Sequence, residues 1–312
     1  MVNGPQISLK NIFLSFGEKQ IFEGLNLLVQ PRDRIALVGR NGSGKSTLLK
    51  VLQGLVIQDE GERILSKGLS VGYMEQDPNL SEFVTLKDYV CSGVLVSDYH
   101  EGEKVAQNLG VDLDMPVNVS SGGERRRAAL TKLIAENHDI MLLDEPTNHL
   151  DVEAIEWLEA ELKGLSKSFI VISHDRKFLS NLTNDTIWVD RGQARRCSIG
   201  FGGFEAWRDK IWHEEDEKIH KLNRKIRSES RWAVEGISAR RKRNQGRLRN
   251  LEKLRAERQS YISRTGLAKM KLESRTKSGQ LVLKVDKVSK SFGEKCIIRN
   301  FSIQIRKGDR IG

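Results

Sequence analysis

An internal repeat constrains this 312-residue chain more than any other feature, because residues 284–312 echo residues 8–36. The strongest correspondence joins residues 15–19 with residues 291–295, which both read Ser-Phe-Gly-Glu-Lys. Such a repeat predicts two copies of one structural unit. We therefore expect a first unit over residues 1–203, a linker over residues 204–279 and the start of a second unit over residues 280–312.

A glycine-rich loop follows an apolar run at residues 35–38, which is typical of a strand buried on both faces of a parallel sheet. The loop and the start of the helical stretch behind it consist of Gly39, Arg40, Asn41, Gly42, Ser43, Gly44, Lys45, Ser46 and Thr47. In such a loop, backbone N–H groups close around phosphate oxygens, and glycine avoids obstruction by a Cβ. Lys45 can then reach the β- and γ-phosphates of a nucleotide, and Ser46 can ligate Mg²⁺. By the repeat, a second such loop would begin just beyond Gly312.

Two more apolar runs, residues 140–143 and 169–172, end in polar side chains. Ligands gather at the carboxyl ends of strands in an open parallel sheet, so these ends are expected to converge with the glycine loop. Asp144 is expected to hold Mg²⁺ directly or through water, and Glu145 to polarise an attacking water molecule. The fold class predicted is α/β: a P-loop NTPase cassette with a mainly parallel sheet and a helical subdomain, followed by a long helical hairpin.

The sequences of two segments resemble motifs of the ABC-F family of ATP-binding cassette proteins. Residues 144–151, Asp-Glu-Pro-Thr-Asn-His-Leu-Asp, are similar to its Walker B motif and D-loop. The family's signature loop is matched by Ser121, Gly122, Gly123 and Glu124. The resemblance implies that ATP and Mg²⁺ are the ligands, and that the signature loop closes the γ-phosphate of an ATP held by the opposite cassette.

Three further residues take expected roles from this resemblance. Gln76 matches the Q-loop residue that contacts Mg²⁺ and water, and His174 matches the switch histidine that senses the γ-phosphate. Phe16 stands where an aromatic ring packs on adenine. One departure is Ser120, because the family usually has leucine there and the serine removes an apolar anchor from the signature turn. The other is the short segment between Gln76 and Ser121, which leaves little room for the helical arm of many relatives.

The linker is the basic part of a chain whose formal net charge is +10. Residues 210–277 hold 21 Lys and Arg against 9 Asp and Glu, and apolar residues recur there at helical spacing on both sides of Gly236. This pattern predicts two long helices in an antiparallel hairpin. The stretch 232–244 resembles the interdomain linker of the Uup-type branch of the family.

Six linker cations fall within ten positions, with too few acids nearby to pair them within one helix: Arg240, Arg241, Lys242, Arg243, Arg247 and Arg249. Phosphate contact is the favoured interpretation, and a solvated helix face kept soluble by charge is the alternative. The nucleic acid would be ribosomal RNA or tRNA, or branched DNA. The other expected partner is a second cassette, in one longer chain or in a homodimer.

Two other functions stay open: an ATPase subunit of a membrane transporter, and a DNA-binding accessory protein with a secondary ATPase. No apolar run approaches the roughly 18 residues of a membrane span, and no signal peptide begins the sequence, so a cytoplasmic location is expected. A membrane-bound coupling partner would support the first alternative. A preference for branched DNA over ribosomes at physiological salt would support the second.

Overall fold

The computed structural model describes residues 4–74, 78–93, 99–235, 245–260, 281–292, 295–306 and 309. The chain divides into two compact units, Met1–Ile262 and Ser263–Gly312. The first unit contains both sheets of the cassette, the helices that cover them and a long helical hairpin. In its described residues, the second contains one β-hairpin.

A six-stranded sheet forms the centre of the first unit, with the strand order β5-β6-β7-β3-β8-β9. Its strands are β3 (Arg34–Gly39), β5 (Val71–Tyr73), β6 (Ile140–Asp144), β7 (Ser168–Ile172), β8 (Asp185–Asp190) and β9 (Gln193–Cys197). All neighbouring strands pair in parallel except β8 and β9. The three apolar runs of the sequence are β3, β6 and β7, and every residue of β6 and β7 is buried. The predicted mainly parallel sheet is therefore confirmed.

A smaller antiparallel sheet packs over one face of this central sheet. It has the order β2-β1-β4 and consists of β1 (Ile7–Phe16), β2 (Lys19–Val29) and β4 (Glu60–Leu65). The helix α1 (Lys45–Gln53) contributes Leu48 and Leu49 to the core that these strands share with β3. The P-loop helix is therefore fixed by the apolar contacts that join the two sheets.

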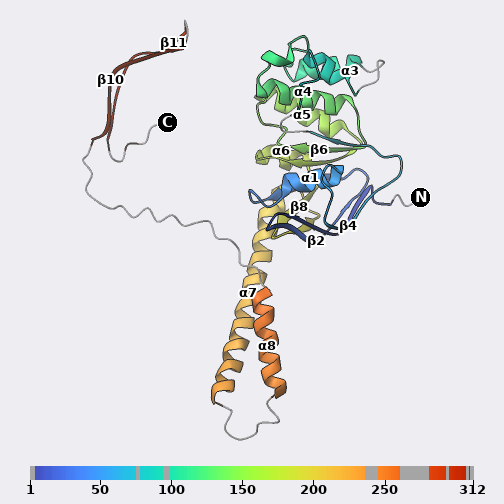
Figure 1. Ribbon diagram of the computed structural model, residues 1–312, viewed down its shortest axis with the longest axis vertical. Helices are drawn as coiled ribbons and strands as arrows, with labels where there is room; N and C mark the ends of the chain where they lie inside the picture. Colours follow the sequence, from blue (N-terminus) through green and yellow to red (C-terminus); the bar gives the residue numbers. More distant parts are fainter. Residues whose placement is uncertain are drawn as a thin grey trace. The chain divides into compact units, whose positions relative to one another are not determined.

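A second apolar core lies on the other face of the central sheet and continues into a helical subdomain. Its helices are α2 (Leu86–Cys91), α3 (Tyr99–Asn108), α4 (Gly122–Ala135), α5 (Val152–Gly164) and α6 (Arg176–Leu182). Figure 1 shows α3 and α4 at the end of the cassette that lies away from β2 and β4. The predicted helical subdomain is thus present.

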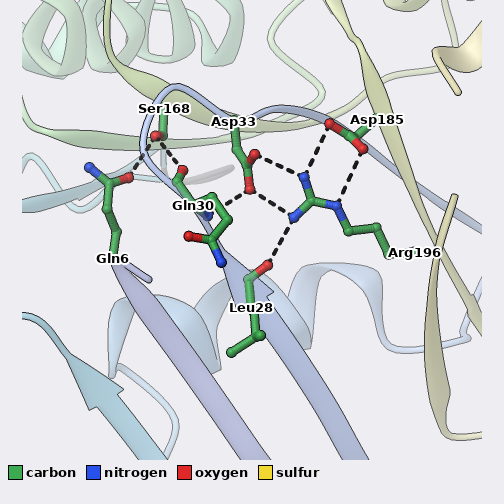
Figure 2. Close-up of polar contacts among 7 residues, drawn as sticks. All are labelled: Gln6, Leu28, Gln30, Asp33, Ser168, Asp185 and Arg196. Carbon is green, nitrogen blue, oxygen red and sulfur yellow. Dashed lines mark hydrogen bonds and ion pairs between the residues drawn. The ribbon is translucent and has the colours of Figure 1, made fainter. Parts of the chain in front are cut away.

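A polar cluster ties the smaller sheet to the central one (Figure 2). Arg196 of β9 donates through Nη1 and Nη2 to the two oxygens of Asp33, both at 2.8 Å, and it also donates to Asp185 of β8. Asp33 in turn accepts from the backbone N–H of Gln30 at 2.7 Å. The Ser168 hydroxyl, at the start of β7, lies 2.6 Å from Gln6 Oε1. The strands β7, β8 and β9 and the turn after β2 therefore meet at these few side chains.

The linker forms the predicted helical hairpin, in which α7 (Phe201–Glu235) and α8 (Gln245–Ser260) lie side by side (Figure 1). Its turn lies outside the described residues. An aromatic cluster holds the base of α7 to the cassette, where Trp188 of β8 meets Phe204, Trp207 and Trp212 edge to face. No helix in the described ranges is long and apolar enough to cross a membrane.

The second unit repeats the first hairpin of the cassette. Its strands, β10 (Leu281–Phe292) and β11 (Lys295–Arg306), pair as β1 and β2 do: Leu9 lies opposite Leu27, and Val285 lies opposite Ile303. The register shifts also fall at equivalent positions. Asn11 and Lys287 both adopt left-handed backbone, with φ of 51° and 48°. The sequence repeat is therefore also a structural repeat, down to its bulges.

Arg196→Met should lower the free energy of unfolding by about 1–3 kcal/mol, because it leaves the Asp33 and Asp185 carboxylates together without their donor. Urea unfolding followed by circular dichroism measures the loss. Lys10→Met, which removes an exposed cation from β1, should change stability by less than about 0.5 kcal/mol. Equal stability of the two variants would contradict a structural role for the cluster.

Candidate nucleotide site

The glycine loop lies between β3 and α1, and two of its glycines are sterically required. A Cβ at Gly39 would lie 2.5 Å from the Val189 carbonyl oxygen, because β8 passes close to the end of β3. Gly44 has φ of 96°, and a Cβ there would lie 2.7 Å from Ile21. Both positions therefore exclude other residues, and the loop keeps its backbone N–H groups uncovered by side chains.

Lys45 is the first residue of α1, and its ammonium folds back onto the loop. Nζ donates to the carbonyl oxygens of Gly39 at 3.0 Å and Arg40 at 3.2 Å. Burial lowers the pKa of Lys45, and the nearby carboxylates of Glu145 and Asp144 oppose that shift. The ammonium is thus held between the loop and two acids, where an anionic ligand could compete for it.

Asp144 ends β6 at the same edge of the sheet and is almost entirely buried. Its Oδ2 atom, like Ser43 Oγ in the loop, is buried and has no hydrogen-bond partner among the described residues. Unsatisfied buried polar atoms are rare and costly in folded proteins. A metal-bound nucleotide is the kind of ligand that would satisfy a carboxylate oxygen and a loop hydroxyl together, so the residues present fit ATP with Mg²⁺.

Glu145 follows Asp144 in left-handed backbone, with φ of 54°. Its Oε2 accepts from the backbone N–H of His174 at 3.1 Å, and its Oε1 lies 3.5 Å from His174 Nε2. Burial raises the pKa of Glu145, while the charge of a protonated His174 would lower it. The side chain of His174 is 76% exposed and that of Glu145 is 13% exposed, so the histidine can reach a ligand from the solvent side.

A pocket of about 290 Å³ brings these elements together. Its lining residues are Asn41, Gly42, Gly44, Lys45, Ser46, Thr47, Asp144, Glu145, Ile172 and His174. The predicted convergence of the glycine loop with the ends of β6 and β7 is therefore seen in the structure. Phe16, which is 54% exposed at the end of β1, does not line the pocket, nor do Ser121, Gly122, Gly123 and Glu124. Gln76 lies outside the described residues.

The signature residues begin α4 with a complete capping box. Glu124 Oε2 accepts from the backbone N–H of Ser121 at 2.6 Å, and Ser121 Oγ accepts from the N–H of Glu124 at 3.3 Å. These contacts from Ser121 hold the pKa of Glu124 below its usual value. In place of the apolar anchor that the family usually has, Ser120 makes hydrogen bonds in this turn. The Ser120 hydroxyl lies 2.6 Å from the Val117 carbonyl oxygen, and Arg125 donates to the same hydroxyl at 3.0 Å.

Four residues near the signature loop were missed by sequence reasoning: Arg125, Arg126, Arg127 and His149. Three consecutive arginines directly after the signature residues are a detectable signal, because clustered cations repel one another unless they have local partners. Arg125 holds the turn before the helix, while Arg126 and Arg127 reach His149 of the loop after Glu145.

The linker cations do not all stand free. Arg247 pairs with Glu229 of α7 and stacks over Trp232, with its guanidinium carbon 4.0 Å from the ring centre. The acid that pairs with Arg247 comes from the other helix of the hairpin, so the shortage of acids within its own helix does not leave Arg247 free. Arg249 is exposed on α8, and Arg240, Arg241, Lys242 and Arg243 lie outside the described residues.

Comparisons with known proteins agree with this site. Residues 22–148 match the ABC transporter family. The chain is 42% identical to the ATP-binding protein Uup of Caulobacter vibrioides, over 98% of this chain and 50% of that protein. It is 32% identical to Uup of Escherichia coli strain K12, over 98% of this chain and 54% of that protein. It thus spans about half the length of the Uup proteins it matches.

More distant relatives and solved structures extend the comparison. The chain is 28% identical to the energy-dependent translational throttle protein EttA of Mycobacterium tuberculosis, over 98% of this chain and 62% of that protein. An ATP-binding subunit of an ABC transporter superposes with a TM-score of 0.57, at 17% identity, over 62% of this chain and 90% of that one. A dimeric ATP-binding cassette in a post-hydrolysis state, bound to ADP and Pi, superposes with a TM-score of 0.54, at 23% identity, over 62% of this chain and 98% of that one. Over nearly its whole length the chain is therefore similar to the Uup and EttA proteins, and residues 22–148 match the ABC transporter family.

Ser120→Ala should destabilise the protein by about 1 kcal/mol, since it removes two hydrogen bonds at a buried position. The rate of amide hydrogen exchange in the first turn of α4 should rise in the same variant. Ser228→Ala is a matched control, because this exposed serine lies 2.9 Å from the carbonyl oxygen three residues before it, as Ser120 does at 2.6 Å. An equal effect at both serines would refute the role assigned to Ser120.

Proposed function

We propose that this chain binds ATP with Mg²⁺ and hydrolyses it by water attack on the γ-phosphate. The observation that supports the proposal most is the pocket where Lys45, Asp144, Glu145 and His174 meet the glycine loop. An ammonium and a loop of backbone N–H groups suit a triphosphate. The buried oxygen of Asp144, without a partner in the described part of the chain, suits a cation.

Each role in this proposal follows from a position in the pocket. Ser46 and Asp144 would hold Mg²⁺, which typically takes one or two protein oxygens beside substrate phosphates and offsets their charge. Gln76 is proposed as a further contact to it. Glu145 accepts a proton from the water molecule while the water oxygen attacks the γ-phosphorus. A carboxylate of raised pKa suits this role as a base. His174 senses the γ-phosphate, and Phe16 packs on adenine.

The complete site is proposed to be composite. The signature residues Ser121–Gly123 do not line the pocket around Lys45, so they would close on a nucleotide held by a facing cassette. That cassette would belong to one longer chain or to a second copy. Under this proposal, residues 1–203 are the first cassette, residues 204–279 a basic linker, and residues 280–312 the start of a second cassette.

We infer further that the intact protein uses the closing motion on a ribosome or on structured nucleic acid. The support is the basic linker, whose exposed cations on α7 and α8 include Arg224, Arg227, Arg249 and Lys253. Rows of cations along a helix favour phosphate contact. EttA, the 28% identical relative, is named a translational throttle, which favours RNA over branched DNA as the first target to test.

Lys45→Ala and Glu145→Gln should separate binding from turnover. Removing the ammonium should weaken ATP binding at least several-fold, because it is the loop cation facing both acids. The amide of Glu145→Gln cannot accept the proton, so ATP should still bind while hydrolysis falls by about 100-fold or more. Calorimetric titration and phosphate release measure the two effects. Unchanged ATP affinity in folded Lys45→Ala, or normal turnover in Glu145→Gln, would contradict the assignment.

Reversing Arg240, Arg241, Lys242 and Arg243 to Glu should remove most affinity for RNA. The slope of log affinity against log salt should also flatten, by about 0.7 for each lost contact to a single strand. Anisotropy titrations with labelled RNA and branched DNA across a KCl series measure both quantities. The control reverses four exposed lysines of the cassette, Lys10, Lys67, Lys104 and Lys177, with the same change in net charge. Equal losses in the two variants would mean that the linker has no special role.

A further inference from the structure

We infer that His149 is a positioning residue, which ties the loop after Glu145 to the first turn of α4. Through this contact the signature residues and the catalytic carboxylate would move as one body. The inference rests on the proposed composite site, because it concerns how two nucleotides would be handled by one cassette. The contact itself can be tested without any ATPase activity.

The geometry of the contact is specific. Arg126 Nη1 lies 3.0 Å from His149 Nε2, and Arg127 Nη1 donates to the His149 carbonyl oxygen at 3.2 Å. A guanidinium has no acceptor, so Nε2 must accept and the ring must carry its proton on Nδ1. Gly123 lies against the same residue, since a Cβ there would be 3.5 Å from His149 Cβ. Side chain and backbone of His149 are thus both held by α4.

The backbone of this loop is strained, which argues for a purpose. Glu145 and His149 both adopt left-handed conformations, with φ of 54° and 67°. Neither residue is glycine, and such conformations persist only where the surroundings enforce them. Arg126 and Arg127 lie in the second turn of α4, where both reach His149 of this loop. The contacts that join the loop to α4 offset the conformational strain of the two left-handed residues.

The loop connects this contact to the reacting centre. The N–H of Asn148 donates to the Glu145 carbonyl oxygen at 3.2 Å, and the Glu145 carboxylate accepts from His174. At its other end, Asp151 caps α5 by accepting from Ala154 at 2.8 Å. A displacement of the first turn of α4 by a facing nucleotide would therefore reach Glu145 through few intervening groups.

The test compares His149→Leu with His149→Gln, whose amide oxygen can still accept from Arg126. His149 is exposed, so neither change opens the core. We expect His149→Leu to lower kcat about tenfold through misplacement of catalytic groups, with KM and ATP affinity changed less than about twofold. His149→Gln should keep most of kcat. Arg126→Met should match His149→Leu, and the double variant should be no worse than either, because both changes remove the shared contact between Arg126 and His149.

Hydrogen exchange in the 312-residue chain gives the independent readout. Exchange at residues 121–126 should rise in His149→Leu and return toward normal in His149→Gln. His213→Leu, on an exposed face of α7, should change neither exchange nor kcat. If the chain shows no ATPase activity even at concentrations at which two copies can face each other, the proposed function fails while the exchange result still decides the contact. Unchanged exchange in His149→Leu, or equal loss of kcat in both His149 variants, would overturn the inference.

Discussion

The half-buried ammonium of Lys45, held between the glycine loop and the carboxylates of Asp144 and Glu145, is the interaction on which the site depends. The strands β3 and β6 must end at one edge of the sheet to bring these groups together, and β7 brings His174 to the same edge. β3, β6 and β7 do so because their apolar residues bury both faces of the sheet and leave only their ends to carry polar side chains. The opposing pKa shifts of Lys45 and Glu145 follow from that shared burial.

Sequence reasoning found the strands and the pocket because both rest on strong local patterns. Runs of four apolar residues fixed β3, β6 and β7, and the glycine loop fixed the start of α1. It missed the role of His149, because that role depends on left-handed backbone at a residue that is not glycine, and on arginines from a helix in another part of the chain. It noticed that Ser120 removes an apolar anchor, but not that Arg125 donates a hydrogen bond to the Ser120 hydroxyl, because that partner follows from the fold of the turn.

The two copies of the repeated hairpin separate what local sequence determines from what packing determines. Ile7, Ile12, Phe22 and Leu25 are fully buried in the first copy, whereas the equivalent Leu283, Val288, Ile298 and Phe301 are each at least 40% exposed in the second. Register, bulges and left-handed positions are nevertheless the same. Pairing and bulges thus arise within the hairpin itself, while burial of its apolar face requires a helix such as α1 and a second sheet.

The linker shows why a count of charges cannot by itself define a binding surface. Arg247, Arg255 and Arg258 of α8 all contact side chains of α7, namely Glu229, Ser230 and Asn223. These arginines hold the hairpin together, and their guanidinium groups are only partly available to another ligand. Arg249 and Lys253 lie on α8 among them and are exposed. The proposed nucleic-acid surface therefore includes fewer cations than the sequence suggests. The arginines between the helices set the geometry of the hairpin, and the exposed cations on its outer faces are the ones proposed to contact phosphate.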